Sequence, residues 1–244
     1  MATAFSVRGL SGERLFFGAM GLAILALVFA GFAPTYFLRG VMDAGRPLAP
    51  LAPLVHVHGI VFSAWIILFI GQTALISTRR PKWHRRVGYA AAALATAMIV
   101  VGLLTGARQL AIGINPASLP PAMWFALPFW SLVAFAVLVS AGLAFRRNPQ
   151  AHKRLMLLAT LGMLQPAVGR MSMPFHPLGA ETNALMAFLM VVPLIVWDLK
   201  RKGAPHRATL FGIAVLAAEQ LIRVTTWHTE GWQSFAAALA TAIA

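Results

Sequence analysis

Seven long apolar runs, separated by short connections that hold most of the charge, constrain this 244-residue chain more than any other feature. A helix needs about 20 mainly apolar residues to cross the hydrocarbon core of a bilayer, and each run is close to that length. The runs are Leu15 to Leu38, Leu54 to Ser77, Val87 to Leu110, Ala122 to Phe145, Leu155 to Met173, Asn183 to Asp198 and Ala208 to Thr226. They predict an all-α integral membrane bundle of seven transmembrane helices in a single domain, residues 1–244. The apolar tail Ser234 to Ala244 is too short to span and predicts a short interfacial helix.

Composition and missing motifs exclude several classes of protein. Charged residues make up 11% of the chain, less than half of the roughly 25% typical of soluble domains. Because cysteine is absent, the chain has no disulfide, thiolate metal site, iron–sulfur cluster or cysteine nucleophile. A retinal-binding rhodopsin is excluded because every lysine lies between the apolar runs, at Lys82, Lys153, Lys200 and Lys202. The H-E-x-x-H, P-loop and G-x-G-x-x-G patterns are also absent, so neither a zinc protease nor a nucleotide-binding protein is indicated.

The basic residues predict which end of the bundle faces the cytoplasm. Lys and Arg beside a span resist translocation, whereas acidic residues contribute little. Fifteen of the 20 basic residues fall at the N-terminus and in alternate connections, and the other side has only Arg39, Arg46, Arg108, Arg170 and Arg223. We therefore expect a bacterial-type inner membrane protein with its N-terminus inside and its C-terminus outside. The formal charge of +14 lies in short loops beside the lipid bilayer, so it does not indicate a nucleic-acid partner.

Three histidines on the inner side, His84, His152 and His206, each begin an odd-numbered predicted helix and precede a basic residue. A b-type haem in a helical bundle needs two facing imidazoles at matched depth, small residues beside the flat ring, and cations for its propionates. His84 and His152 meet the depth requirement, and a Gly- and Ala-rich helix follows His84. The neighbouring cations are Arg85, Arg86 and Arg154.

The leading interpretation is therefore a haem b-binding electron-transfer protein with His84 and His152 as axial ligands. Such a protein exchanges electrons with a quinone or another redox partner. In the alternative interpretation, the alanines allow close helix packing and the histidines lie at a wet interface beside lipid phosphates.

The other four histidines fall on the outer side. His58, Trp65 and Gln72 recur every seven residues along the second predicted helix, which predicts that His58 faces inward and makes it a further candidate for cofactor binding. Two thioethers and an imidazole are soft ligands suited to Cu(I). These ligand types support a copper-handling or oxidase-assembly protein as an alternative function, unless the methionines only pack near a helix end. The candidate copper ligands are His56, His58, Met171, Met173, His176 and His228.

Polar residues in the fifth and seventh predicted spans form a second candidate site. Glu219 and Gln165 both lie about 15 Å into their helices, at the 1.5 Å rise per residue of an α-helix, and so reach the bilayer midplane. A charged, unpaired carboxylate there costs about 2.5 kcal/mol or more, so we expect Glu219 to be protonated or paired. One expected partner of Glu219 is Arg223, four residues later on the same helix, and Arg170 could reach Glu219 from the fifth predicted helix. A structural ion pair, a proton relay, a quinone contact and a small-molecule carrier site all remain open.

Several short segments resemble a family of uncharacterised bacterial multi-pass membrane proteins (a domain of unknown function). The segments are Gly71-Gln72, His84-Arg85 with Gly88, His152-Lys153-Arg154-Leu155-Met156, and Pro166-Ala167-Val168-x-Arg170, which cover roughly residues 56–170. The family pattern couples a G-x-x-Q, an H-R-x-x-G and an H-R-x-x-M segment ending in Arg. In this chain Gly and Gln are adjacent, and Lys153 replaces the Arg of the third segment. More remotely, histidines at the start of alternate helices are similar to those of two-haem transmembrane b-type cytochromes, which implies haem binding, although the fourth predicted helix has no histidine.

Overall fold

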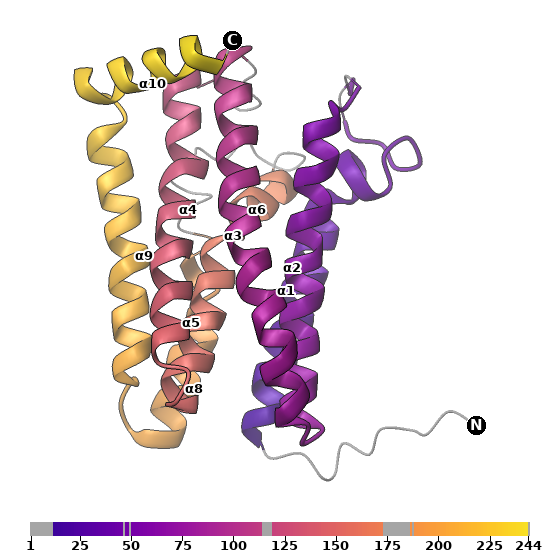
Figure 1. Ribbon diagram of the computed structural model, residues 1–244, viewed down its shortest axis with the longest axis vertical. Coiled ribbons are helices and arrows are strands. Elements are labelled where there is room, and N and C mark those ends of the chain that lie inside the picture. The colour runs from indigo at the N-terminus through magenta and orange to yellow at the C-terminus, as the bar shows by residue number, and fades with distance from the viewer. Residues whose placement is uncertain are drawn as a thin grey trace.

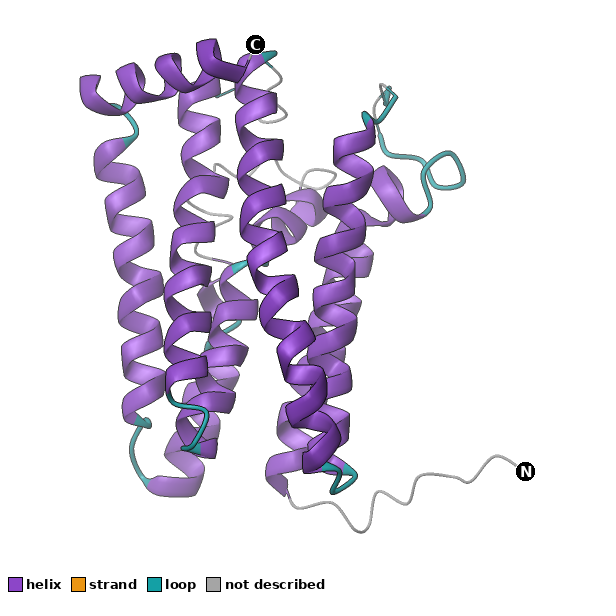
Figure 2. Ribbon diagram, in the orientation of Figure 1, coloured by secondary structure: helices purple, strands orange, loops and turns teal. Residues whose placement is uncertain are grey.

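Helices make up nearly all of the regular structure in the computed structural model, which describes residues 12–243 without 46, 49, 114–118, 173–185 and 187 (Figure 2). The expected all-α fold is confirmed for these residues. The helices are α1 (Gly12–Phe32), the π-helical segment η2 (Ala33–Phe37), α2 (Pro53–Ser77), α3 (Pro81–Ala111), α4 (Pro121–Ala144), α5 (Pro149–Gly162), α6 (Gln165–Ser172), α8 (Val192–Lys202), α9 (Arg207–Thr226) and α10 (Glu230–Ile243).

Five helical segments in the described residues are long and apolar enough to cross a membrane. They are Gly12–Phe37, which joins α1 to η2, together with α2, α3, α4 and α9. These segments correspond to the first four predicted runs and the seventh. Helices long and apolar enough to span a membrane are therefore present at five of the seven expected places.

The fifth predicted run is not one continuous helix, which corrects that expectation. α5 ends at Gly162, the chain turns through Met163 and Leu164, and α6 begins at Gln165. Pro166 explains the break: it has no N–H to bond the carbonyl four residues earlier, but it is tolerated in the first turn of a new helix. In the sixth predicted run, the described residues contribute α8, which has 11 residues and continues past Asp198.

The long helices run side by side along the main axis of the bundle (Figure 1). α2 packs against α1 and α3, α4 packs against α3 and α9, α5 packs against α4 and α9, and α6 packs against α1. α10 lies across one end of the bundle, against α3 and α4. The opposite end holds the start of α1 and the α2–α3, α4–α5 and α8–α9 connections. We call it the basic end, because these connections and their borders carry Arg79, Arg80, Arg146, Arg147 and Lys202.

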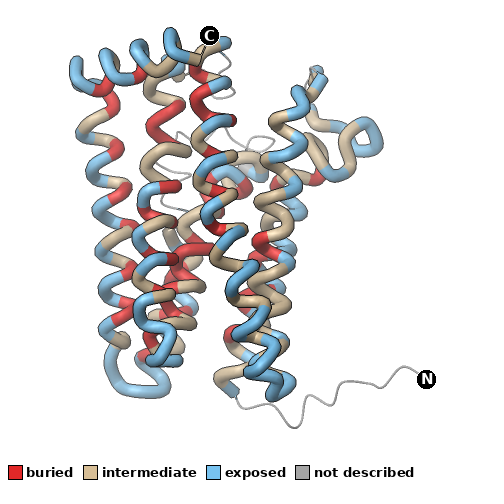
Figure 3. The backbone as a smooth tube through the Cα atoms, in the orientation of Figure 1, coloured by how far each residue is buried: buried red, intermediate tan, exposed pale blue. Residues whose placement is uncertain are grey.

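Buried residues concentrate on α4 and α5, whereas α2 buries little of its surface (Figure 3). The buried residues of α2 are Trp65 and Ile66. Trp65 donates a hydrogen bond from Nε1 to Oγ1 of Thr160 on α5, at 3.2 Å. At the end of the bundle that α10 covers, Trp232 of α10 donates a hydrogen bond from Nε1 to the carbonyl of Ala122 on α4, at 2.8 Å. The predicted C-terminal helix is therefore present, and its tryptophan attaches it to the end of the bundle.

Candidate functional site

Two imidazoles from different helices lie next to each other near the basic end. His84 belongs to the first turn of α3 and His152 to the first turn of α5, and each follows a proline that begins its helix, Pro81 or Pro149. The ring centroids are 6.1 Å apart and the ring planes cross at 85°. The expectation that these rings share a depth is confirmed. The local signal is the repeated pattern Pro-x-x-His-basic-Arg, which occurs at 81–86 and 149–154.

A backbone carbonyl fixes the orientation of the His152 ring and, when the ring is neutral, its tautomer. Nδ1 of His152 lies 2.8 Å from the carbonyl oxygen of Gly142, in the last turn of α4, where helix carbonyls lack an intrahelical partner. A carbonyl can only accept, so Nδ1 carries the proton and Nε2 of the neutral ring keeps its lone pair. This is the arrangement in which an imidazole is ready to bind a metal through Nε2.

His84 and Gln72 bring two buried polar atoms without a partner to the same place. Gln72, on α2, donates a hydrogen bond from Nε2 to the backbone carbonyl of His84, at 3.2 Å. Within the described part of the chain, Nδ1 of His84 and Oε1 of Gln72 are buried and make no hydrogen bond. Native structures rarely leave such atoms unsatisfied, which makes this position a candidate site. The sequence placed Gln72 on the stripe of α2 but did not assign it to the site.

Small residues leave room beside the two rings. One face of α3 continues from His84 through Gly88, Ala91, Ala92 and Ala95, at the spacing of successive helical turns. A Cβ added at Gly88 would meet only the Gln72 amide nitrogen, at 3.7 Å, and one added at Gly71 would meet nothing within 4 Å. A flat ring system is therefore accommodated more easily here than beside branched side chains.

The spacing of the two rings is compatible with an iron or other metal held between them. Two imidazoles that share one metal, with metal–nitrogen bonds of about 2 Å, place their ring centroids roughly 6 Å apart, which matches the observed 6.1 Å. Imidazoles can rotate about this shared axis, so a crossing angle of 85° is compatible with it. In the described residues no group of three or more His, Asp or Glu side chains could hold a metal ion. Zinc takes four ligands, whereas a porphyrin itself supplies four nitrogens.

The three arginines expected to pair with haem propionates differ in their exposure to solvent. Arg85 and Arg86 are exposed beside His84, and the guanidinium of Arg86 lies over the ring of Trp83, 5.4 Å from its centroid. Arg154 is only 1% exposed, and its Nη2 lies 2.5 Å from Oδ1 of Asp198 on α8. Arg154 therefore forms a buried ion pair with Asp198. This pairing corrects the expectation that Arg154 binds propionates.

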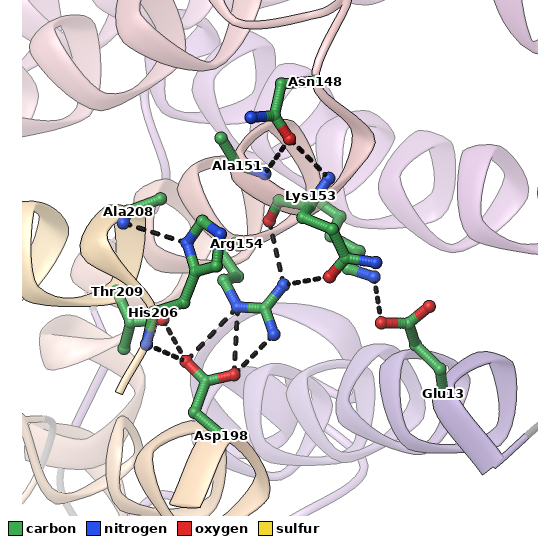
Figure 4. Close-up of polar contacts among 10 residues, drawn as sticks. Glu13, Asn148, Ala151, Lys153, Arg154, Asp198, His206, Ala208 and Thr209 are labelled. Atoms are coloured by element: carbon green, nitrogen blue, oxygen red, sulfur yellow. Dashed lines mark hydrogen bonds and ion pairs between the residues drawn. The ribbon is translucent and has the colours of Figure 1, made fainter. Parts of the chain in front are cut away.

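A polar network around Asp198 holds the beginning of α5 in place (Figure 4). The Asp198 carboxylate accepts hydrogen bonds from Arg154, from Oγ1 of Thr209 at 2.6 Å and from the backbone N–H of His206 at 2.9 Å. Lys153 forms an ion pair with Glu13 of α1. These contacts tie α5 to α1, α8 and α9 immediately after His152, so the network positions that ring.

His206 caps a helix instead of contributing to the pair of rings. Its Nδ1 accepts a hydrogen bond from the backbone N–H of Ala208 at the start of α9, at 3.1 Å. Burial, together with the positive charges of Arg154 and Lys202, lowers the pKa of His206 below its ordinary value. The folded state therefore favours the neutral ring, whose lone pair forms the cap.

Stability should consequently depend on pH through His206. Because the folded-state pKa is lowered, the contribution of the cap is complete above about pH 6.5 and is lost as pH falls below that value. Replacing His206→Asn keeps a capping acceptor that does not titrate, so the variant should lose less stability between pH 7.5 and pH 5.5, by about 1 kcal/mol or less. Thermal unfolding in detergent at several pH values measures this difference. Identical pH profiles for the two proteins would contradict it.

The outer histidines that the structure describes, His56, His58 and His228, lie apart from the two rings. His58 stacks on Phe62 with centroids 4.0 Å apart and its Nδ1 is buried, whereas His56 is exposed, so the prediction that His58 faces inward is confirmed. His228 lies between α9 and α10, beside the ring of Trp227. Of the remaining copper candidates, Met171 is exposed, and Met173 and His176 lie outside the described residues.

The midplane residues form an ion pair and a small cavity. Nε of Arg223 lies 3.4 Å from Oε1 of Glu219, which confirms this expected pairing. Gln165 and Glu219 both line a cavity of about 20 Å³, which holds about one water molecule and is too small for an organic substrate. The guanidinium of Arg170 lies over the ring of Phe32, 4.4 Å from its centroid.

Comparisons of the chain with protein-family models, with curated proteins and with solved structures found no match. The functional assignment therefore depends on the residues of the site and their geometry.

Proposed function

We propose that this protein is a membrane-bound electron-transfer protein that binds a b-type haem, with His84 and His152 as the two axial ligands. The observation that carries the proposal is the 6.1 Å separation of the two rings. The hydrogen bond from Nδ1 of His152 to the Gly142 carbonyl supports it, because it leaves Nε2 as the ligand atom. The two unsatisfied polar atoms beside His84 support it further.

The side chains around the rings have separate roles in this proposal. When bound, the haem supplies one-electron redox chemistry. His84 and His152 would hold the iron from both sides, which would favour electron transfer over binding of an external ligand. The small face of α3 that begins at Gly88 would give the ring room, and the exposed Arg85 and Arg86 would be available to pair with the propionates. A quinone or another redox partner would exchange electrons with this site.

We further propose seven crossings of a bacterial inner membrane, with the basic end inside. α5 begins at the basic end and α8 ends there, so the chain must leave that end and return between them. The break between α5 and α6 is compatible with a membrane, because Leu157, Leu158 and Ala159 of α5 are 0% exposed and interrupted backbone is tolerated where protein surrounds it. The positive-inside rule then places the N-terminus in the cytoplasm and the C-terminus outside.

An absorption spectrum of the protein, expressed with ample haem and purified in detergent, tests the proposed cofactor. We expect a Soret band, the spectrum of a six-coordinate low-spin haem, and one haem per chain by pyridine haemochrome analysis. Protein that lacks a Soret band, both as purified and after incubation with haemin, would overturn the proposal.

Gln72 should tune the site through His84. When His84 binds iron through Nε2, its Nδ1–H needs an acceptor, and Oε1 of Gln72 is the buried acceptor nearby that lacks a partner. Gln72→Leu should therefore weaken haem retention by roughly 10- to 100-fold, as loss of such an outer partner does in metal sites, and raise the midpoint potential because the imidazole becomes less basic. Haem titration and a redox titration measure the two effects.

Gln109→Leu provides the matched control, because Gln109 lies near the far end of α3 and accepts a hydrogen bond from Trp124. We expect it to keep the haem affinity and midpoint potential of the wild type. If Gln72→Leu has the same haem affinity and midpoint potential as this control, Gln72 does not contribute to the site.

A further inference from the structure

We propose that the turn between α2 and α3 binds the phosphate headgroup of an anionic phospholipid. An open groove of about 410 Å³ lies at this turn, lined by Arg79, Arg80, Pro81, Lys82 and Trp83. Three of its five lining residues are cations. Neither the histidine pair nor the proposed electron transfer uses this groove, so the proposal stands independently of the haem.

The backbone of the turn holds an arginine where a glycine is expected. The N–H of Arg80 bonds the carbonyl of Leu75 at 2.8 Å, and the N–H of Arg79 bonds that of Ile76 at 3.1 Å, which together form a Schellman motif at the end of α2. This motif needs a left-handed residue, and Arg79 takes that position with φ 59°. The comparable left-handed residues after α3 and α8 are Gly113 and Gly203. Arg79 is thus kept in a conformation that strains an L-residue, and such outliers concentrate at functional sites.

The cations of the groove have no anionic partner among the residues that the structure describes. In the described residues, the side chains of Arg79, Arg80 and Lys82 make no hydrogen bond or ion pair. The two acidic residues near the basic end are already paired, Glu13 with Lys153 and Asp198 with Arg154. An external anion would therefore offset the repulsion among the three cations. A phosphate suits the groove, since guanidinium groups bind it by charge-assisted hydrogen bonds and the uncapped N-terminus of α3 favours negative charge.

Two aromatic side chains place the groove at the depth of lipid headgroups. Trp83 is 55% exposed and Tyr89 is 82% exposed, and both belong to the first turns of α3. Exposed Trp and Tyr near the end of a membrane helix prefer the interface between hydrocarbon and water. Basic pockets on the cytoplasmic side of membrane helices are suited to acidic headgroups. A lipid phosphate is therefore the expected occupant, in preference to a soluble one.

Native mass spectrometry of the full chain in detergent, titrated with phosphatidylglycerol or phosphatidylcholine, tests the proposal. We expect the wild type to bind phosphatidylglycerol and to bind phosphatidylcholine much more weakly. Arg79→Gly should bind phosphatidylglycerol about fivefold more weakly, the effect expected for one cation near a membrane surface. The same variant should unfold at a higher temperature, because glycine adopts the left-handed conformation without strain. Lys82→Gln should weaken binding similarly.

Arg147→Gly is the matched control, since it removes an exposed arginine from another turn at the basic end. We expect it to retain wild-type phosphatidylglycerol binding. Equal losses in Arg79→Gly and Arg147→Gly would overturn the proposal, because they would indicate diffuse attraction to the whole basic end. Unchanged binding in both Arg79→Gly and Lys82→Gln would also overturn it. Displacement of the lipid by millimolar inorganic phosphate, with no preference between the two lipids, would overturn the headgroup assignment and indicate a soluble anion.

Discussion

Alanine in place of either His84 or His152 is expected to remove the low-spin haem spectrum of the purified protein. Each change deletes one of the two rings whose centroids lie 6.1 Å apart, and the ring that remains cannot fill both axial positions. Haem affinity should fall by more than the roughly 10- to 100-fold that follows loss of an outer-sphere partner. Absorption spectra and haem titration measure the loss, and circular dichroism checks that the helices persist.

His56→Ala is the control for this experiment, because His56 is exposed and belongs to the first turn of α2, whereas Gln72 beside the rings lies near the end of that helix. It should leave the spectrum unchanged. Added imidazole should partly restore the low-spin spectrum of His84→Ala and His152→Ala by entering the vacated space. If both variants keep a wild-type spectrum, the assignment of the axial ligands is wrong.

Asp198→Ala is expected to reduce the stability of the protein more than His206→Asn or Glu13→Gln does. It leaves the guanidinium of Arg154, which is 1% exposed, without its carboxylate. Breaking a buried ion pair in this way costs about 3–5 kcal/mol. Thr209 and the N–H of His206 also lose their acceptor. Thermal or denaturant unfolding in detergent measures the change, and a lower haem occupancy should accompany it because α5 carries His152.

A double variant separates the charge effect from general damage to the fold. Arg154→Met combined with Asp198→Leu removes both charges, so most of the lost stability should return. Glu13→Gln is the comparison for an ion pair near the surface, because Glu13 is 41% exposed in its pair with Lys153, and it should cost about 1 kcal/mol or less. A cost for Asp198→Ala no larger than that of Glu13→Gln would contradict the buried-pair interpretation.

The sequence predicted correctly those structural features that depend on a single segment of the chain. Apolar runs predicted five helices that are long and apolar enough to cross a membrane in the structure, because the length and composition needed to cross a bilayer are properties of a single segment. The seven-residue spacing on α2 predicted that His58 faces inward, since helical periodicity alone decides which residues share a face. Pro166 was an available signal for the break in the fifth run, but hydropathy averaged over a long window conceals one proline.

Interactions between segments are what the sequence could not specify. Arg154 follows His152 directly, so proximity along the chain predicted a shared site, yet Arg154 is directed toward Asp198, 44 residues away. Gln72 was visible as part of a stripe, but its hydrogen bond to His84 exists only because α2 and α3 pack together. Likewise, the strained position of Arg79 follows from the hydrogen bonds of its turn and not from its chemical type.

The sequence by itself determined that this is an all-helical chain with helices suited to a membrane and with its cations gathered at one end, because hydropathy and charge act segment by segment. Only the tertiary structure decided that Gly142 holds the His152 ring, that Gln72 binds the backbone of His84 and that Asp198 binds Arg154. These contacts depend on which helix faces meet, and packing of the whole bundle sets that choice.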